Sequence, residues 1–341
     1  MNILVVGSSL PGAMELSIVR GLKHDSRVNQ VKLYATNAFH ASPSLTTKVL
    51  RRLSPNLYPG IVAFNHTLRE EVNTSKWDVM LVFKGMQIRP ATLRKLRPNI
   101  LLVNYNPDNP FIYSGIGSGN VNMTKSFPLY HLYLTYDRKV ATHIEDSGIA
   151  SGVVPFGFED NRRFDITLDP KDEINRACFL GNADEHRTQF LIRFAQEVPL
   201  DIVGSGWNKS RFPSSVRFHS PVYGDDFFDT LRRYRVQLNL MRPHNPDSHN
   251  MRTFDIVGCG GVGLMPRTAD HTDYFQEGEH LFLYNDLGDA VAKAKAVLNE
   301  NSETISALRS QARAWAVDQG FNYDRRASQM VNCIERVRKT S

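Results

Sequence analysis

The chain of 341 residues is poor in cysteine and contains no long apolar run. Its three cysteines, Cys178, Cys259 and Cys333, are too widely spaced for a zinc site or a disulfide framework. This favours a reducing, cytoplasmic location. No stretch of about 18 apolar residues is present, so we expect no transmembrane segment. The first residues, MNILVVGSS, predict a β-strand and not a signal peptide.

Several nucleotide-binding and metal-binding motifs are also absent. The loop at residues 7–12, GSSLPG, fits neither G-x-G-x-x-G nor the Gly-Lys-Ser/Thr of a P-loop, which disfavours NAD chemistry and ATP hydrolysis. No Asp-x-Asp ends a predicted strand, because Asp225 and Asp226 open a predicted helix. His244 and His249 have no third ligand at a suitable spacing. We therefore expect no metal and no cofactor.

The charge excess is small, with 41 Lys and Arg against 35 Asp and Glu and a net charge of +6. A well-solvated surface explains this value, but so would attraction to anionic donors, a membrane surface or nucleic acid. No nucleic-acid recognition motif accompanies the charge. Charge alone therefore does not define a partner.

Short β-branched runs alternate with helix-length segments in both halves of the chain, which is typical of doubly wound α/β sheets. The predicted strands are residues 2–6, 31–34, 79–83, 100–103, 132–135 and 152–155, and then 177–180, 200–203, 216–218, 236–240, 261–264 and 280–284. The predicted helices include residues 12–24, 137–147, 303–318 and 324–338. The length and this repeated rhythm predict two Rossmann-like domains.

A polar stretch at residues 157–173 interrupts the rhythm and predicts a linker. We assign residues 1–157 to an N-terminal, acceptor-side domain and residues 174–320 to a C-terminal, nucleotide-sugar-binding domain. Residues 321–341 should form a helix that packs back on the first domain. Two such domains would face each other across a cleft, with ligands at the carboxyl ends of the strands.

Two loops of the first domain are candidate sites. Residues Ser8, Ser9 and Gly12 lie in the loop after the first strand, where glycine permits close approach of a ligand. An ordinary turn explains this loop equally well. Asp108 lies in an Asn/Asp/Pro cluster after the fourth predicted strand, where a carboxylate could act on an acceptor. Turn formation is the alternative reading of that cluster.

The second domain offers the richer set. Gly181 and Gly206 follow its first two strands, and Arg187 lies near a helix start, a pattern that suits phosphate binding. Residues 239–263 then combine a strand end, a polar loop, a short helix beginning near residue 250 and closing glycines. The candidate donor-binding residues there are Arg242, His244, Asn250, Arg252, Thr253, Phe254 and Asp255, with Asp247 as a further candidate catalytic carboxylate.

This last segment, with the run NMRTFDI followed by Cys259-Gly260-Gly261, resembles the C-terminal signature of CgeB-like glycosyltransferases, which have the GT-B fold and are named after a spore-maturation protein. Similar but weaker agreement extends over most of the chain. Many GT-B enzymes carry E-x7-E at this place. By this resemblance Asp255 would bind ribose hydroxyls and Asp247 the donor sugar, without a metal. Both positions hold Asp where that motif has Glu, so the reach of Asp247 is one methylene shorter.

The resemblance implies a glycosyltransferase, of hexosyl or pentosyl type, that moves a sugar from a nucleoside-diphosphate sugar to an acceptor hydroxyl, and it favours retention of configuration. The acceptor could be a glycan, a small molecule, a protein or a DNA base. Two alternatives stay open. One is a transferase acting on modified bases of phage DNA, and the other is a GT-B nucleotide-sugar epimerase that needs no acceptor.

Overall fold

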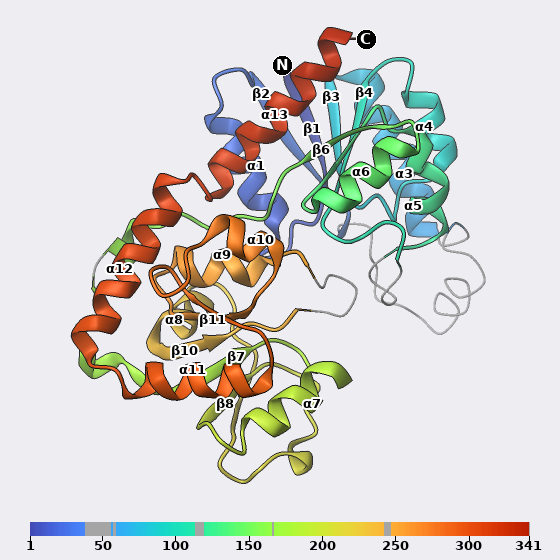
Figure 1. Ribbon diagram of the computed structural model, residues 1–341. Coiled ribbons are helices and arrows are strands. Elements are labelled where there is room, and N and C mark those ends of the chain that lie inside the picture. Colours follow the sequence, from blue (N-terminus) through green and yellow to red (C-terminus); the bar gives the residue numbers. More distant parts are fainter. Residues whose placement is uncertain (38–55, 57–58, 113–118, 166, 242–246, 341) are drawn as a thin grey trace. The chain divides into compact units, whose positions relative to one another are not determined.

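The computed structural model describes all residues except 38–55, 57–58, 113–118, 166, 242–246 and 341 (Figure 1). Its contacts divide the chain into two compact units. The first unit comprises Met1–Pro155 and Asp324–Ser341, and the second comprises Phe156–Tyr323. The chain therefore begins and ends in the first unit. The polar segment at residues 157–173 lies inside the second unit.

The first unit is built on a six-stranded parallel sheet in the order β2-β1-β3-β4-β5-β6. Val5 in the centre of β1 pairs with Leu33 of β2 and Leu81 of β3. The central strands are buried along their length, as expected for a parallel sheet covered by helices. The strands are β1 (Asn2–Gly7), β2 (Gln30–Ala35), β3 (Val79–Phe83), β4 (Leu101–Asn106), β5 (Leu132–Thr135) and β6 (Ala150–Val153).

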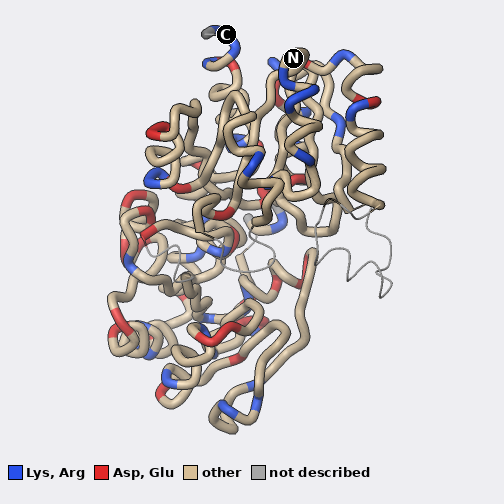
Figure 2. Tube along the Cα trace, turned by 90° about the vertical axis from the view of Figure 1, so that its right-hand side faces the viewer, with Lys and Arg blue, Asp and Glu red and all other residues tan. Residues whose placement is uncertain are grey.

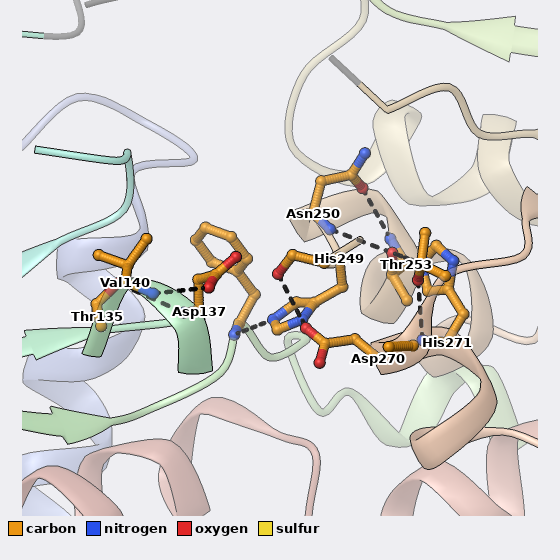
Figure 3. A network of polar contacts seen from close by, with 12 residues as sticks. Thr135, Asp137, Val140, His249, Asn250, Thr253, Asp270 and His271 are labelled. Atoms are coloured by element: carbon orange, nitrogen blue, oxygen red, sulfur yellow. Dashed lines mark hydrogen bonds and ion pairs between the residues drawn. The ribbon is translucent and has the colours of Figure 1, made fainter. Parts of the chain in front are cut away.

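The helices of this unit flank the sheet and include the last helix of the chain. Arg27 ties that helix down, because its guanidinium donates to Ser328 Oγ at 2.8 Å and to Glu335 Oε2 at 3.3 Å. Asp137 caps α6 by accepting the Val140 N–H at 3.0 Å (Figure 3). The helices are α1 (Met14–His24), α3 (Pro59–Thr74), α4 (Pro90–Leu96), α5 (Val121–Ser126), α6 (Arg138–Asp146) and α13 (Tyr323–Thr340), with a short turn η3 (Phe127–Leu129).

The second unit has its own six-stranded parallel sheet, in the order β12-β11-β10-β7-β8-β9. Its strands are β7 (Ile174–Leu180), β8 (Leu200–Val203), β9 (Arg217–His219), β10 (Tyr234–Leu238), β11 (Gly263–Pro266) and β12 (Phe282–Tyr284). Its helices are α7 (Glu185–Phe194), α8 (Asp225–Arg233), α9 (Met251–Gly258), α10 (Ala269–Tyr274), α11 (Leu287–Asn299) and α12 (Ser302–Asp318), with short turns η4 (Arg162–Asp165), η5 (Pro170–Asp172) and η6 (Lys209–Arg211).

Each sheet changes its direction of strand order at one place, next to β1 in the first unit and next to β7 in the second. Loops diverge there, so the carboxyl ends of the strands at this point are the usual ligand site of an open α/β sheet. The loops after β1 and β7 are therefore the first places to look for a site.

The predicted strands all occur, with one instructive shift in β4. The sequence predicted its end at Val103, but it continues to Asn106. Asn favours turns, yet here the side chains of Asn104 and Asn106 are fully buried and bonded. Asn106 Nδ2 donates to Tyr133 Oη at 3.0 Å. Pairing with β3 and β5 on both sides extends the strand against the local preference.

Basic and acidic residues are both distributed over the two units (Figure 2). Among the helices that the structure describes, none combines the length and the apolar character needed to cross a lipid bilayer.

Candidate functional site

Two arginines converge on the turn at the carboxyl end of β7. Arg187 Nη1 lies 3.3 Å from the carbonyl oxygen of Asn182, and Arg252 Nε lies 3.5 Å from that of Leu180. Gly181 lies between these two residues. The sequence predicted that Arg187 and Arg252 flank one site, and the structure brings both guanidiniums to one tripeptide. Such a pair can bind a phosphate group through forked, charge-assisted hydrogen bonds.

Glycine geometry keeps the backbone around this turn compact. Gly204 follows β8 at φ 151°, and a Cβ there would lie 2.1 Å from the Gly181 carbonyl oxygen. Gly206 has φ 82°. Trp207 donates its indole N–H to Gly181 O at 3.1 Å and packs its ring edge-on against Phe179. The turns after β7 and β8 therefore lie directly against each other, and a residue larger than glycine at position 204 would not fit between them.

Arg187 is positioned by the start of α7. Asp184 caps this helix by accepting the Arg187 N–H at 2.9 Å, and its other oxygen lies 3.3 Å from Arg187 Nε. The guanidinium also lies over the Phe179 ring, 5.5 Å from its centroid. Its side chain is only 14% exposed, so its charge faces a restricted space and not bulk solvent.

Arg252 is positioned by α8 and α9. Its guanidinium lies over the Phe227 ring at 4.1 Å, and its Nη1 pairs with Asp255 Oδ2 at 2.9 Å. Burial raises the pKa of the Asp255 carboxyl to about 6, although the neighbouring Arg252 opposes this shift. Asp255 is thus a buried carboxylate that titrates near neutral pH, held by one guanidinium.

The start of α9 is fixed by a capping box. Asn250 Oδ1 accepts the Thr253 N–H at 3.2 Å, while Thr253 Oγ1 accepts the Asn250 N–H at 3.3 Å. His271 supports the box from α10: its Nδ1 lies 2.7 Å from Pro266 O, and its Nε2 lies 2.9 Å from Thr253 Oγ1. Burial lowers the pKa of His271 to about 4. The ring is therefore neutral, donates to Pro266 and accepts from Thr253.

His249 fixes the residues just before this helix (Figure 3). It is fully buried. Its Nε2 accepts the Phe156 N–H at 3.3 Å, so its Nδ1 donates to Asp270 Oδ2 at 2.7 Å. Ser248 Oγ donates to the same carboxylate oxygen at 2.9 Å. These contacts make His249 and Asp270 a buried support for the Arg252 and Asp255 segment. Sequence reasoning had weighed His249 only as a metal ligand and had missed Asp270 and His271.

Several predicted donor-binding residues have structural contacts of their own. Phe254 is fully buried and packs against the rings of Tyr274 and Phe321, so its side chain lies in the core. Thr253 is also fully buried, and its hydroxyl serves the capping box and His271. Asn250 is the helix cap and bonds Asn239 as well. Phe254 follows the capping residue Asn250 by about one helical turn, and an apolar residue at this distance from a capping box is typical of a helix start. The sequence alone had suggested a binding role for the same residues.

The remaining predicted residues of this segment are less defined. Arg242 and His244 lie outside the described residues. Asp247 is exposed, whereas Asp255 is buried. The two carboxylates that the sequence placed on one ligand thus differ in environment, and only Asp255 belongs to the arginine pair at β7.

In the first unit, side chains of the protein already accept backbone N–H groups of the loop after β1. The Ser8 N–H donates to Glu15 Oε1 at 3.0 Å, and the Ser9 N–H donates to Asn37 Oδ1 at 2.8 Å. Gly12 has φ 78°, which suits a turn residue. These amides are thus engaged, and a carboxylate lies where an anionic ligand would have to approach. The structure gives Ser8, Ser9 and Gly12 a turn role and adds Glu15, which the sequence analysis did not consider.

Asp108 forms a different polar group at the ends of β3 and β4. Its Oδ2 lies 2.6 Å from Lys84 Nζ, and its N–H donates to Asn106 Oδ1 at 3.0 Å. Lys84 has φ 58°, and among the described residues it is the only non-glycine residue with a positive φ. A left-handed lysine costs about 1–2 kcal/mol, and such strain often marks functional positions. No sequence pattern marks Lys84, because strain is a property of the folded backbone.

Comparison with known proteins adds the following. The model of a family described as "Glycosyl transferase-like" matches residues 187–332, a range that contains Arg187, Arg252 and Asp255. No curated protein sequence matches the chain. This similarity covers most of the second unit and extends into α13.

Solved structures resemble the whole chain. Sucrose-phosphate synthase from Thermosynechococcus elongatus has a TM-score of 0.68 at 10% identity, with 100% of both chains covered. HepE of Anabaena in complex with UDP-glucose has a TM-score of 0.61 at 15% identity and covers 98% of this chain and 99% of its own. A putative UDP-N-acetylglucosamine 2-epimerase from Listeria monocytogenes has a TM-score of 0.59 at 12% identity, covering 100% and 97%.

These likenesses establish the fold. Two parallel six-stranded sheets with flanking helices match the GT-B glycosyltransferase structures, and the fold class predicted from the sequence is confirmed. The resemblance to GT-B glycosyltransferases is confirmed at this level, while the CgeB-like subfamily stays a prediction.

Proposed function

We propose that this protein is a glycosyltransferase that uses a nucleoside-diphosphate sugar as donor. The observation that carries the proposal is the convergence of Arg187 and Arg252 on the turn at residues 180–182. A donor diphosphate is a good leaving group only if its growing negative charge is stabilised, and fixed guanidiniums provide this without a metal. The glycosyltransferase-like family match over residues 187–332 supports the same chemistry.

The remaining roles in this proposal follow from position. Asp255 would accept a hydrogen bond from a ribose hydroxyl, and Asp247 would contact the donor sugar, as the CgeB-like resemblance implies. Lys84 and Asp108 would bind the acceptor, with Asp108 as the base or orienting group. The acceptor hydroxyl would attack the anomeric carbon while the nucleoside diphosphate leaves. The proposal also includes retention of the anomeric configuration, transfer of a hexosyl or pentosyl group, and a cytoplasmic location.

The first experiment is a thermal-shift panel of UDP, GDP, ADP and dTDP sugars, followed by transfer assays with the best donor. A ligand at about 100 times its dissociation constant adds about 2.7 kcal/mol of stability. We expect one nucleotide class to stabilise the protein, and we expect this binding to persist in EDTA. If no nucleotide sugar stabilises the protein, or if stabilisation requires manganese or magnesium, the proposed donor chemistry is wrong.

A nucleotide-sugar epimerase is the second candidate, because a putative UDP-N-acetylglucosamine 2-epimerase shares the fold over the whole chain. An epimerase converts its donor without any acceptor. Proton NMR of the donor incubated with the protein alone separates the two functions. A new sugar stereoisomer on an intact nucleotide supports the epimerase, whereas free nucleoside diphosphate that appears only with an acceptor supports the transferase.

A further inference from the structure

A second cluster of arginines lines a cavity of the second unit, at the end of the sheet where its strands begin. The cavity has a volume of about 340 Å³ and is lined by Arg232, Arg309 and Arg313, together with Ser306, Ser310 and Phe164. Arg232 lies at the end of α8, directly before β10, and Gly260 in the same wall precedes β11. The cavity is therefore at the amino ends of the strands, whereas Arg187 and Arg252 lie at the carboxyl end of β7.

Two of these arginines have structural partners. Arg309 donates to Glu173 Oε1 at 2.7 Å and to Gly260 O at 3.2 Å. Arg313 donates to Asp160 Oδ1 at 3.2 Å and to the Gly258 carbonyl oxygen. Both guanidiniums thus satisfy backbone carbonyls at the end of α9 while a carboxylate offsets their charge.

Arg232 differs from both. Its Nη1 reaches the Arg163 carbonyl oxygen at 3.5 Å, and its guanidinium lies 5.9 Å from the Phe164 ring centroid. No ion pair joins it to a carboxylate of the described residues, because nearby Asp225 and Asp229 pair with Arg163. Burial lowers the pKa of Arg232, the charges of Cys259 and Asp229 oppose this shift, and those of Arg313 and Arg163 add to it. A half-buried guanidinium in this state gains much from an added anion.

The rest of the lining suits a phosphorylated small molecule. Ser306 and Ser310 line the cavity from α12, where Ser310 Oγ donates to the Ser306 carbonyl oxygen at 3.1 Å, and Phe164 lines it as well. Asp318 is the one carboxylate among the lining residues, against three arginines. The volume is in the lower range of pockets that hold small ligands. We propose that this cavity is an accessory site for a small phosphate monoester, such as a phosphorylated sugar, and that Arg232 is its main anchor.

The test is calorimetric titration with glucose 1-phosphate, on the wild type and on two matched variants of α8. Arg232→Gln should lower the affinity at least about tenfold, because a charge-assisted bidentate contact is lost. Arg233→Gln removes the same charge one residue away, where the side chain is exposed and donates to Asp172 O. It should change the affinity less than about twofold. Equal affinity of the wild type and Arg232→Gln overturns the proposal, as does an absence of binding to the wild type.

A second pair of variants avoids any folding problem at Arg232. Ser310 is exposed on α12, so Ser310→Glu should fold, and its carboxylate should abolish binding, whereas Ser310→Gln should retain most of it. Glucose 1-phosphate could also bind the donor arginines, and Arg252→Gln distinguishes this case. If Arg252→Gln abolishes binding and Arg232→Gln does not, the ligand occupies the donor site and the accessory site is refuted, while the proposed transferase function stands.

Discussion

The loops after β1 and β7 occupy equivalent places in their sheets, yet they have opposite electrostatic character. After β1, the carboxylate of Glu15 accepts the Ser8 amide. After β7, the guanidiniums of Arg187 and Arg252 lie against the turn. The strand order changes next to both strands, so topology alone would predict a ligand at either loop.

The difference teaches that the sheet supplies a position and the side chains decide its use. A glutamate in the first turn of α1 fills the amide site that a phosphate would need. In the second unit, Asp184 pairs with Arg187 and Asp255 pairs with Arg252, so each guanidinium at this turn has a carboxylate partner, while no carboxylate of the described residues is bound to the amides of the turn itself. In the function proposed above, the second unit would bind the anionic donor and the first unit the acceptor.

The largest effect should come from removing Arg187 or Arg252, the two arginines that distinguish the loop after β7 from the loop after β1. Arg187→Ala and Arg252→Ala should each lower kcat about 100-fold or more, corresponding to about 3 kcal/mol of lost transition-state stabilisation. Lys should restore only part, since it lacks the bidentate fork. Steady-state kinetics with circular dichroism would measure this. Arg193→Ala, on the exposed face of α7, is the control. Near wild-type turnover of both variants would place the diphosphate elsewhere.

The substitution Asp255→Asn should raise the stability of the protein at pH 8 and lower its affinity for the nucleotide. The folded-state pKa of about 6 lies above the ordinary value of an aspartate, so the folded protein holds this proton more tightly than the unfolded chain. Wild-type stability should therefore fall as the pH rises from about 4 through 6, by up to about 3 kcal/mol. The Asn variant lacks this loss. It should be more stable at pH 8 and equal below pH 4, while nucleotide affinity falls about tenfold.

Chemical denaturation at several pH values, with calorimetry at pH 8, checks both parts. Acid also protonates His271, whose pKa is lowered to about 4, but this affects both proteins alike and cancels in the difference. A variant that binds the nucleotide with unchanged affinity would remove Asp255 from the donor site. A variant less stable than the wild type at pH 8 would instead show that the ion pair with Arg252 outweighs the cost of burial.

Lys84→Gly tests the acceptor side. Glycine adopts φ 58° without strain, so the loss of the half-exposed ion pair with Asp108 should be offset, and the free energy of unfolding should change by less than about 1 kcal/mol. Transfer should fall about tenfold or more with donor affinity unchanged. Donor titration and transfer assays together decide the matter, because an unchanged transfer rate would assign Lys84 a purely structural role.

The smallest effect should come from Glu15→Ala in the loop after β1. It removes the acceptor of the Ser8 amide and should destabilise the protein by about 1 kcal/mol. Nucleotide affinity should not change, since the loop belongs to the other unit. Thermal unfolding with and without nucleotide measures both quantities. A gain of anion binding in this variant would show that Glu15 alone had excluded a phosphate from the first loop.

The buried strands could be predicted because they are short continuous apolar runs, and the long helices because their apolar residues repeat at the helical period. β3, β5 and β8 match their predicted ranges, and α9 begins near residue 250 as predicted, with Asn250 as its cap. Asn104 to Asn106 were placed in a loop because local preference cannot anticipate pairing with two neighbouring strands.

The candidate site was only partly predictable for a related reason. Arg187 and Arg252 stand beside glycine turns, a signal that is local in sequence. The buried partners that hold them depend on long-range contacts, such as His249 with Asp270 and His271 with Thr253. Phe254 was assigned to the ligand because sequence alone does not say which side of α9 faces the core, whereas the structure buries it completely. Lys84 was missed because no residue type announces a left-handed backbone.

The course of the chain, which enters the second unit at Phe156 and leaves it at Tyr323, has a consequence for dissecting the protein genetically. The two crossings are tied together, since the Phe158 N–H donates to Phe321 O at 3.2 Å and the Tyr323 N–H donates to Phe158 O at 3.1 Å. The second unit is thus an insertion with adjacent ends, which can be cloned as one uninterrupted fragment. A truncation after Pro155 would instead remove α13 from the first unit. The complete first unit is obtained only when residue 155 is joined to residue 324 through a short linker.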